Sequence, residues 1–514
     1  MRAFLMYRDE DFDLSGTLPA NEAALTQDLG LNRLFTAAAR GDQFLFDVVR
    51  RGVLTSLDTP EAIIYRQRIL ADCLAQPSTI RAIYALTVEA LQAEKQVWSA
   101  FWRSPEAVLS RSVEVLGILV VYLKTLRRMA DEHAAKFVSE GFVRLFASLS
   151  SELDDAYLQT IEQRLRELKF RRGVLISAEL GNGNRGVHHV LRTLPRQRHW
   201  IERLRSNRRS GFGFQIADRD EGGFRALGEL RDRGINIAAN AVAQSADHIL
   251  GFFTMLRVEL GFYVCCLNLQ ERLAGKGEPT CYPVPRPAGT LVLSARGLYE
   301  VGLSLALEGR IVGNDLSADD KSMVMITGAN QGGKSTLLRS VGLAQLMMQS
   351  GMLVAAEAFT ANVCRGVFTH FKREEDTSMK SGKLDEELKR MSEVVEDVGT
   401  NCMLLCNESF AATNEREGSE IARQIVRALT EGGVKVLYVT HQYDLAHSYY
   451  ILGLETVLFL RAERQSDGTR TFRLAEGEPL STSYGEDSYR RIFAPTSSRT
   501  SPEDADVQRL PAQP

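Results

Sequence analysis

The sequence lacks the cysteine spacing that marks a zinc site or a disulfide framework. It has seven cysteines, an odd number, and no two of them form a Cys-x-x-Cys arrangement. We therefore expect free thiols in a reducing compartment. Long apolar runs are also missing, since runs such as Gly117 to Leu123 are far short of the roughly 20 residues that cross a bilayer. No apolar leader follows Met1. These absences predict a soluble, cytoplasmic protein with no membrane partner.

A strong net charge of either sign is missing as well. The formal net charge is −3 over 514 residues, so overall basicity does not indicate a nucleic-acid partner, and local charge must be considered instead. Apolar residues make up 44% of the chain, which allows a large core. A chain of this length is expected to divide into about two to four domains.

The most informative stretch is Thr-Gly-Ala-Asn-Gln-Gly-Gly-Lys-Ser-Thr, residues 327–336, which fits the G-x-x-x-x-G-K-[ST] pattern of a phosphate-binding loop. An apolar run precedes it and leucines follow at near-helical spacing, so the pattern predicts the strand, loop and helix that the motif requires. The alternative is a glycine-rich turn that contains a lysine by chance, and the flanking strand and helix argue against it. Glycines let backbone N–H groups point at phosphate oxygens, and the helix N-terminus adds partial positive charge.

This loop predicts binding of ATP with Mg²⁺. Lys334 would reach the β and γ phosphates, and the Ser335 hydroxyl would hold the metal ion. The residues that we expect to contact the cofactor are Thr327, Gly328, Asn330, Gly332, Gly333, Lys334, Ser335 and Thr336.

Two further apolar stretches end in residues suited to ATP hydrolysis. Residues 402–408 read as a strand ending in Asn407 and Glu408. Asn407 occupies the place where an Asp would normally help to hold Mg²⁺, and its amide oxygen can still bind a metal-bound water. Glu408 is placed to polarise the attacking water, although a solvated carboxylate after a strand is the alternative. Residues 434–440 form another strand, and His441 after it would sense the γ-phosphate unless it is only a polar surface residue.

Helical periodicity and proline placement predict the organisation of the chain. We expect a mostly α-helical N-terminal lever region followed by an α/β P-loop NTPase domain of the ABC-like type. An N-terminal helical segment is predicted at 1–56, with one helical pattern around 31–53. A helical lever follows at 57–275; it contains a basic mixed insert at about 173–235, and helical periodicity returns at 236. A proline-rich linker at 276–289, the ATPase domain at 290–493 and a disordered tail at 494–514 complete the chain.

These motifs, and their order along the chain, resemble those of the MutS family of DNA mismatch-repair and recombination ATPases. The phosphate loop is similar to the family's T-G-P-N-M-G-G-K-S-T, with Ala329 for Pro and Gln331 for Met. Other matching stretches are Val312 to Asp315 with V-P-N-D, Asn407 to Gly418 with D-E-x-G-R-G-T-S-T-x-D-G, Thr440-His441 with T-H, and Ser483-Tyr484-Gly485 with S-Y-G. Residues 60–74, with Arg66, Gln67 and Arg68, look like the start of the family's lever domain.

The resemblance implies a homodimer with two composite ATP sites, coupled through long helices to double-stranded or branched DNA between the arms. Ser381, with Glu386 after it, resembles the family's S-T-F-M-V-E loop, which completes the ATP site of the opposite subunit. Mismatch-repair members carry a mismatch-reading domain with a Phe-x-Glu wedge before the lever, and we find no such segment here. The sequence therefore resembles a short, divergent member of the family.

Local charge suggests where DNA would bind. Residues 164–209 contain thirteen Lys or Arg and three Glu. Phosphate oxygens favour such clusters, and recognition would be of backbone and shape, because no base-reading module is recognisable. The alternative is a solvated basic face. The residues that we expect to contact DNA are Arg192, Arg196, Arg198, Arg203, Arg205, Arg208 and Arg209.

Three functions remain open at this stage. The first is a dimeric, ATP-gated, DNA-binding ATPase in repair or recombination. The second is a nucleotide-gated scaffold that hydrolyses little ATP and recruits protein partners, which Asn407 favours. The third, the motor subunit of a membrane transporter, is weakened by the helical lever and by the lack of an L-S-G-G-Q signature.

Overall fold

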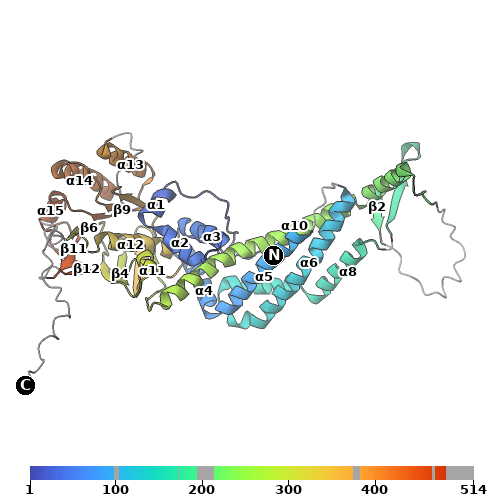
Figure 1. The fold of residues 1–514 in the computed structure, drawn as a ribbon, viewed down its shortest axis with the longest axis horizontal. Helices are drawn as coiled ribbons and strands as arrows, with labels where there is room; N and C mark the ends of the chain where they lie inside the picture. Colours follow the sequence, from blue (N-terminus) through green and yellow to red (C-terminus); the bar gives the residue numbers. More distant parts are fainter. Residues whose placement is uncertain (98–103, 172, 194–213, 374–381, 466–468, 482–514) are drawn as a thin grey trace, which may run out of the picture.

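The molecule is elongated, with a helical N-terminal part that extends away from a C-terminal part built on β-sheets (Figure 1). The computed structural model describes residues 1–97, 104–171, 173–193, 214–373, 382–465 and 469–481. The predicted order, helices first and an α/β part second, is therefore observed.

Helices make up most of the described N-terminal part. Their starts follow sequence signals: Thr59 and Ser104 cap helices with their side chains, and Pro60, Pro77 and Pro105 each occupy a first helical position. The segments are α1 (Glu22–Asp28), α2 (Leu31–Ala39), α3 (Gln43–Leu54), α4 (Pro60–Ala75), α5 (Pro77–Gln96), α6 (Pro105–His133), η1 (Ala134–Lys136), α7 (Glu140–Glu152), α8 (Asp155–Leu168) and α10 (Glu221–Ala274).

The helical pattern predicted around 31–53 is divided between two helices. Arg40 ends α2 in the left-handed region with a φ of 50°, and the Asp42 side chain accepts a hydrogen bond from the Leu45 N–H at the start of α3. The periodicity alone did not show this break. Both helices contact α10, and α1 contacts β8 of the C-terminal part, so residues 1–56 lie between the two parts.

Helix α10 runs most of the length of the molecule (Figure 1). It has 54 residues, which at 1.5 Å per residue gives about 80 Å. The pattern predicted a start at Asn236, but the helix begins at Glu221, inside the expected mixed insert. Length and composition would let α10 cross a membrane, but 67% of its most apolar window is buried, as in a core helix. It packs on α5 and α6 along its middle.

A two-stranded hairpin lies at the end of the helical N-terminal part that is far from the sheets, and this extended part is called the arm. Strands β1 (Leu175–Leu180) and β2 (Gly186–Arg192) pair antiparallel around the short η2 turn (Asn182–Asn184). The hairpin packs on α10 at Gly234, where an added Cβ would lie 2.4 Å from Ile176 Cδ1. The hairpin lies within the mixed insert predicted at about 173–235, whereas Phe214 to Ile216 in the same insert form no strand.

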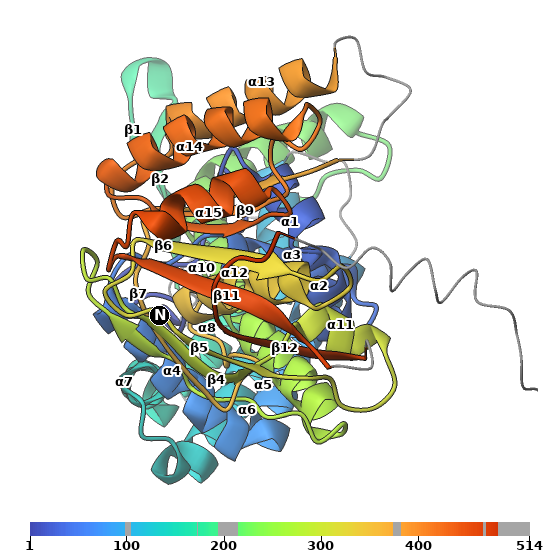
Figure 2. The same ribbon diagram turned by 90° about the vertical axis from the view of Figure 1, so that its left-hand side faces the viewer.

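A six-stranded sheet forms the centre of the C-terminal part (Figure 2). Its strand order is β12-β11-β6-β10-β9-β8, parallel except for the β11–β12 pair. The strands are β6 (Met323–Gly328), β8 (Val367–Phe371), β9 (Met403–Asn407), β10 (Lys435–Val439), β11 (Val457–Arg464) and β12 (Arg470–Glu476). Parallel strands point their carboxyl ends to one edge, and this edge carries the predicted site.

A second sheet has the order β3-β7-β4-β5. Its strands are β3 (Val284–Arg286), β4 (Leu293–Leu298), β5 (Asn314–Ser317) and β7 (Ala358–Asn362), and the remaining helices are α11 (Val301–Ala306), α12 (Lys334–Gln349), α13 (Lys383–Asp397), α14 (Glu415–Glu431) and α15 (Tyr443–Ile451). Helix α12 contacts strands of both sheets. Strand β3 lies within the segment predicted as a linker, so that segment is partly built into the sheet.

Buried polar side chains of α4 join the helical part to the end of α12. Arg66 is fully buried, and its Nε donates to Met6 O at 2.6 Å while Nη1 donates to Ser350 O at 3.3 Å. Gln67 Nε2 donates to Pro283 O at 2.9 Å. Because Ser350 directly follows α12, the helix that begins at the phosphate loop ends at the lever.

Candidate nucleotide-binding site

The predicted phosphate loop lies between β6 and α12, as the motif requires. Gly328 and Gly333 have φ values of 104° and 92°, in the left-handed region that favours glycine, and Gln331 also has a positive φ of 59°. An added Cβ at Gly332 would lie 2.6 Å from the Ala462 Cβ, so this position needs glycine for space. The loop therefore curls tightly against β11 and leads into the N-terminus of a long helix, an arrangement suited to a phosphate.

Lys334 is held inside this loop. Its side chain is 5% exposed, and Nζ donates to Gly328 O and Ala329 O at 3.0 Å each. Burial lowers the pKa of Lys334 to about 8, against the opposing effect of the Glu408 carboxylate. A buried ammonium satisfied only by its own loop carbonyls can exchange them for the oxygens of an anion.

Ser335 and Asn407 meet between α12 and β9. The Ser335 hydroxyl donates to Asn407 Oδ1 at 2.9 Å. A hydroxyl and an amide oxygen are the kind of hard oxygen ligands that Mg²⁺ accepts, and two protein ligands suffice when phosphates and water supply the rest. The residues present therefore fit a Mg²⁺ ion, with less negative charge than an aspartate would provide.

Glu408 and His441 follow the neighbouring strands β9 and β10, and their side chains meet. His441 Nε2 lies 2.9 Å from Glu408 Oε1, and both side chains are 28% exposed. The hydrogen bond from His441 holds the pKa of Glu408 below its usual range, and the charges of His441, Lys334 and Lys372 act in the same direction. Glu408 is thus an ionised, half-buried carboxylate at the sheet edge that carries the phosphate loop.

The other predicted cofactor residues surround the same loop. Thr327 is buried at the end of β6, and Asn330 O accepts a hydrogen bond from Arg470 Nε at 3.2 Å. Thr336 is in the first turn of α12, where its carbonyl accepts from the Ser340 hydroxyl. Ser381 lies outside the described residues.

Sequence reasoning missed the contacts that hold β12 over the loop. Asn314, quoted only as part of a motif, is buried; its Nδ2 donates to Phe472 O at 3.1 Å and its Oδ1 accepts from Leu474 N at 2.8 Å. An added Cβ at Gly333 would lie 3.2 Å from the same Phe472 O. The signal was the position of Asn314 in a matched motif, but nothing in the sequence indicated that its partner would be more than 150 residues away.

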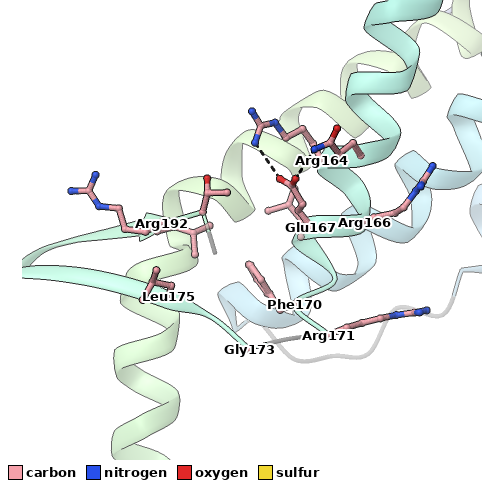
Figure 3. A pocket seen from close by; sticks show the side chains of 12 residues that line it. Arg164, Arg166, Glu167, Phe170, Arg171, Gly173, Leu175 and Arg192 are labelled. Carbon is pink, nitrogen blue, oxygen red and sulfur yellow. Dashed lines mark hydrogen bonds and ion pairs between the residues drawn. The ribbon is translucent and has the colours of Figure 1, made fainter. Parts of the chain in front are cut away.

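The described part of the predicted basic region is at the far end of the arm. Among its described residues, Arg192 donates from Nε to Ser177 Oγ at 2.8 Å across the hairpin. A hollow of about 660 Å³ lies between the end of α8 and this hairpin, with Phe170 near its centre and arginines around it (Figure 3). The arginines that line it are Arg164, Arg166, Arg171 and Arg192. Arg196, Arg198, Arg203, Arg205, Arg208 and Arg209 lie outside the described residues.

Two family models match most of the chain. The "MutS2 N-terminal domain" matches residues 58–276 and "MutS domain V" matches residues 324–500. Among curated relatives named "Endonuclease MutS2", that of Streptococcus uberis is 28% identical over 208 residues, which cover 39% of this chain and 26% of the relative. That of Thermus thermophilus is 34% identical over 131 residues, which cover 25% of this chain and 18% of the relative.

The chain therefore matches about a quarter or less of the length of these relatives. The first family model includes α4 and α10, which carry the lever, and the second includes the phosphate loop, Glu408 and His441. On these matches, the chain belongs to the MutS family.

Proposed function

We propose that this protein is an ATP-gated, DNA-binding ATPase that acts as a homodimeric clamp in DNA repair or recombination, on mismatched or branched DNA. The observation that carries this proposal is one cluster at the carboxyl edge of the central sheet. There the Lys334 ammonium, the Ser335–Asn407 pair and the Glu408–His441 pair come from the start of α12 and from the ends of β9 and β10.

Each member of the cluster has a role in this proposal. Lys334 binds the β and γ phosphates of ATP, and the loop N–H groups hold their remaining oxygens. Ser335 and Asn407 hold Mg²⁺, which neutralises phosphate charge when bound. Glu408 accepts the proton of the attacking water, and His441 orients Glu408 and hydrogen-bonds the γ-phosphate.

DNA binding and dimerisation rest on the arm and on the family. The hollow at the arm's end is bordered by arginines, and phosphate backbones attract such groups. The relatives carry the name endonuclease, and the proposal for this chain concerns ATP-controlled DNA binding. In the dimer, Ser381 of one copy would complete the ATP site of the second copy.

Phosphate release and ATP affinity test the proposal together. Wild-type protein should bind ATP with Mg²⁺ and release phosphate over many turnovers, at a rate that changes when duplex or branched DNA is added. Lys334→Ala should abolish ATP binding, whereas Lys389→Ala, on the exposed side of α13, should not. Normal ATP affinity in Lys334→Ala, or a wild type that stays monomeric and binds no ATP, would contradict the proposal.

The second candidate function is a nucleotide-gated scaffold. Asn407, whose neutral oxygen is the acceptor for Ser335, favours it because the site has less charge to hold Mg²⁺ during hydrolysis. A scaffold would bind ATP tightly and release no more than one phosphate per site. A gel-shift panel of duplex, mismatched, branched and single-stranded DNA, with and without ATP at two salt concentrations, separates DNA-gated from protein-recruiting behaviour.

A further inference from the structure

His370 belongs to none of the short sequence motifs of the nucleotide site, but it lies next to the loop that carries Glu408. It is in β8 and is 1% exposed. Its Nδ1 lies 2.7 Å from the Ser409 hydroxyl oxygen, and its Nε2 lies 3.0 Å from Glu387 O in α13. The ring also stacks on Phe410, with centroids 5.4 Å apart and an angle of 26° between the planes. One imidazole thus contacts both the residue after Glu408 and the helix α13.

The hydrogen-bond partners determine the tautomer of His370. The carbonyl of Glu387 can only accept, so Nε2 must carry a hydrogen and donate. Burial, assisted by the charge of Arg390, lowers the pKa of His370 to about 4, so the ring is neutral near pH 7 and Nδ1 has a lone pair. Nδ1 therefore accepts from the Ser409 hydroxyl, whose single hydrogen is shared with a second acceptor, His370 O, at 2.8 Å.

The loop after β9, which these bonds attach to His370, has a strained backbone and needs this support. Glu408 and Phe410 have φ values of 56° and 60°, a region that non-glycine residues rarely adopt. Ser409 lies between them, is fully buried, and accepts from the Tyr438 hydroxyl through its carbonyl at 2.8 Å. Holding Ser409 therefore holds Glu408 in a conformation that it would not keep by itself.

Helix α13 is attached to β8 through a second residue. Glu387 is buried, which raises the pKa of its carboxyl, and the backbone N–H groups of Phe410 and Ala412 oppose this rise. Arg390 Nη1, one turn further on, donates to Phe371 O in β8 at 3.1 Å. The first half of α13 is therefore attached to β8 through Arg390 and, through His370, to the loop after Glu408.

We propose that His370 is a positioning residue that transmits the position of α13 to Glu408 and so regulates hydrolysis. This inference rests on the proposed ATPase function and deepens it. A shift of α13 would move Glu387 O, reorient the His370 ring and release Ser409. Glu408 would then leave its strained conformation without any change in the phosphate loop, which belongs to other elements.

Two conservative substitutions separate the two bonds of His370. In His370→Gln, the amide nitrogen can take the place of Nε2 and keep the bond to Glu387 O, but the bond to Ser409 is lost. In His370→Asn, the amide oxygen can take the place of Nδ1 and keep the bond to Ser409, but the side chain is too short to reach α13. Ser409→Ala removes this bond from the other side, together with the bond from the hydroxyl to the main-chain oxygen of residue 370. His447→Gln in α15 is the matched control.

We expect kcat for phosphate release to fall roughly tenfold or more in His370→Gln, His370→Asn and Ser409→Ala. The Kd for ATP, measured with a fluorescent ATP analogue, should stay within about twofold of wild type, because the phosphate loop is untouched. The double variant His370→Gln with Ser409→Ala should be no slower than Ser409→Ala alone, since Ser409→Ala already removes the bond to Nδ1 that His370→Gln removes. His447→Gln should match wild type in both quantities.

Three results would overturn the coupling. These are wild-type kcat in His370→Gln and Ser409→Ala, additive losses in the double variant, or a Kd that weakens in step with kcat, which would mean a merely structural role. In each of these the wild type still binds and hydrolyses ATP, so the proposed function stands. A wild type that releases no phosphate instead overturns the proposed hydrolysis, and the coupling with it.

Discussion

His441 Nε2 lies 2.9 Å from Glu408 Oε1, so the residues that end two adjacent parallel strands form one hydrogen-bonded pair. Because the bond and nearby positive charges hold the pKa of Glu408 below its usual range, the carboxylate is ionised at neutral pH. An ionised carboxylate beside a buried lysine can take a proton from water next to a bound phosphate. In the proposed ATPase, the pair is therefore the part of the site most directly tied to hydrolysis.

Glu408→Gln should slow phosphate release by about 10²–10⁴-fold, the usual contribution of a general base. ATP binding should remain, since Gln keeps the size of the side chain and lies outside the phosphate loop. Single-turnover hydrolysis and equilibrium ATP binding measure the two effects. Glu417→Gln, an exposed carboxylate in the first turn of α14, is the control. An unchanged rate in Glu408→Gln would remove Glu408 from the mechanism.

Asn407→Asp should increase Mg²⁺ affinity or hydrolysis. The new carboxylate can still accept from the Ser335 hydroxyl, as Asn407 Oδ1 does at 2.9 Å, and it adds a negative charge beside the metal position. We expect the Mg²⁺ concentration that gives half-maximal phosphate release to fall several-fold.

The control is Asn414→Asp, which keeps the helix cap at the start of α14 and adds the same charge outside the cluster. Kinetics at limiting Mg²⁺ that do not differ between Asn407→Asp and wild type would refute this role for Asn407.

Replacing Arg171 and Arg192 with alanine should weaken DNA binding about equally for all sequences. Each arginine that contacts a phosphate contributes close to one to the slope of log affinity against log salt, so the double variant should lower that slope by about 1 to 2. Fluorescence anisotropy with a labelled duplex at several salt concentrations measures it. Arg427→Ala, an exposed arginine of α14 in the C-terminal part, should leave the slope unchanged. An unchanged slope in the double variant would place DNA binding elsewhere.

Glu259 should make stability depend on pH. This fully buried carboxylate in α10 accepts from Leu5 N at 2.6 Å and Phe12 N at 3.3 Å, and burial raises its pKa from 4.5 to about 7. The pKa of Glu259 is higher in the folded protein than in the unfolded protein. The contribution of Glu259 to stability is therefore complete below about pH 4.5 and is lost as the pH rises through about 7.

Comparison with Glu259→Gln, which cannot ionise, isolates this effect. As the pH rises from about 5 to about 8, the unfolding free energy of the wild type should fall by about 3 kcal/mol relative to that of the variant. Chemical denaturation at the two pH values measures it, with the exposed Glu89→Gln as control. A difference that stays constant with pH would show that Glu259 does not titrate in this range.

The phosphate loop could be predicted from the sequence because its requirements are local. Glycines at positions of positive φ, a buried strand before them and a helix after them all lie within about 30 residues of Lys334, and the structure has each one. The ends of β9 and β10 could be predicted for the same reason, since each is an apolar run with polar residues directly after it. Helix ends were harder: α10 begins at Glu221, where the Asp220 side chain caps the helix by accepting from Gly223 N, although periodicity indicated a start only at Asn236.

By itself, the sequence determined which groups of this protein are suited to phosphate chemistry and in what order they occur, because glycine geometry and strand ends depend on neighbouring residues. Only the tertiary structure decided which of these groups meet and what supports them. The Glu408–His441 pair, the attachment of β12 by Asn314 and the His370 bridge to α13 each join residues far apart in the chain. Such contacts depend on how strands order in a sheet and how helices pack on it, which periodicity and motif spacing do not record.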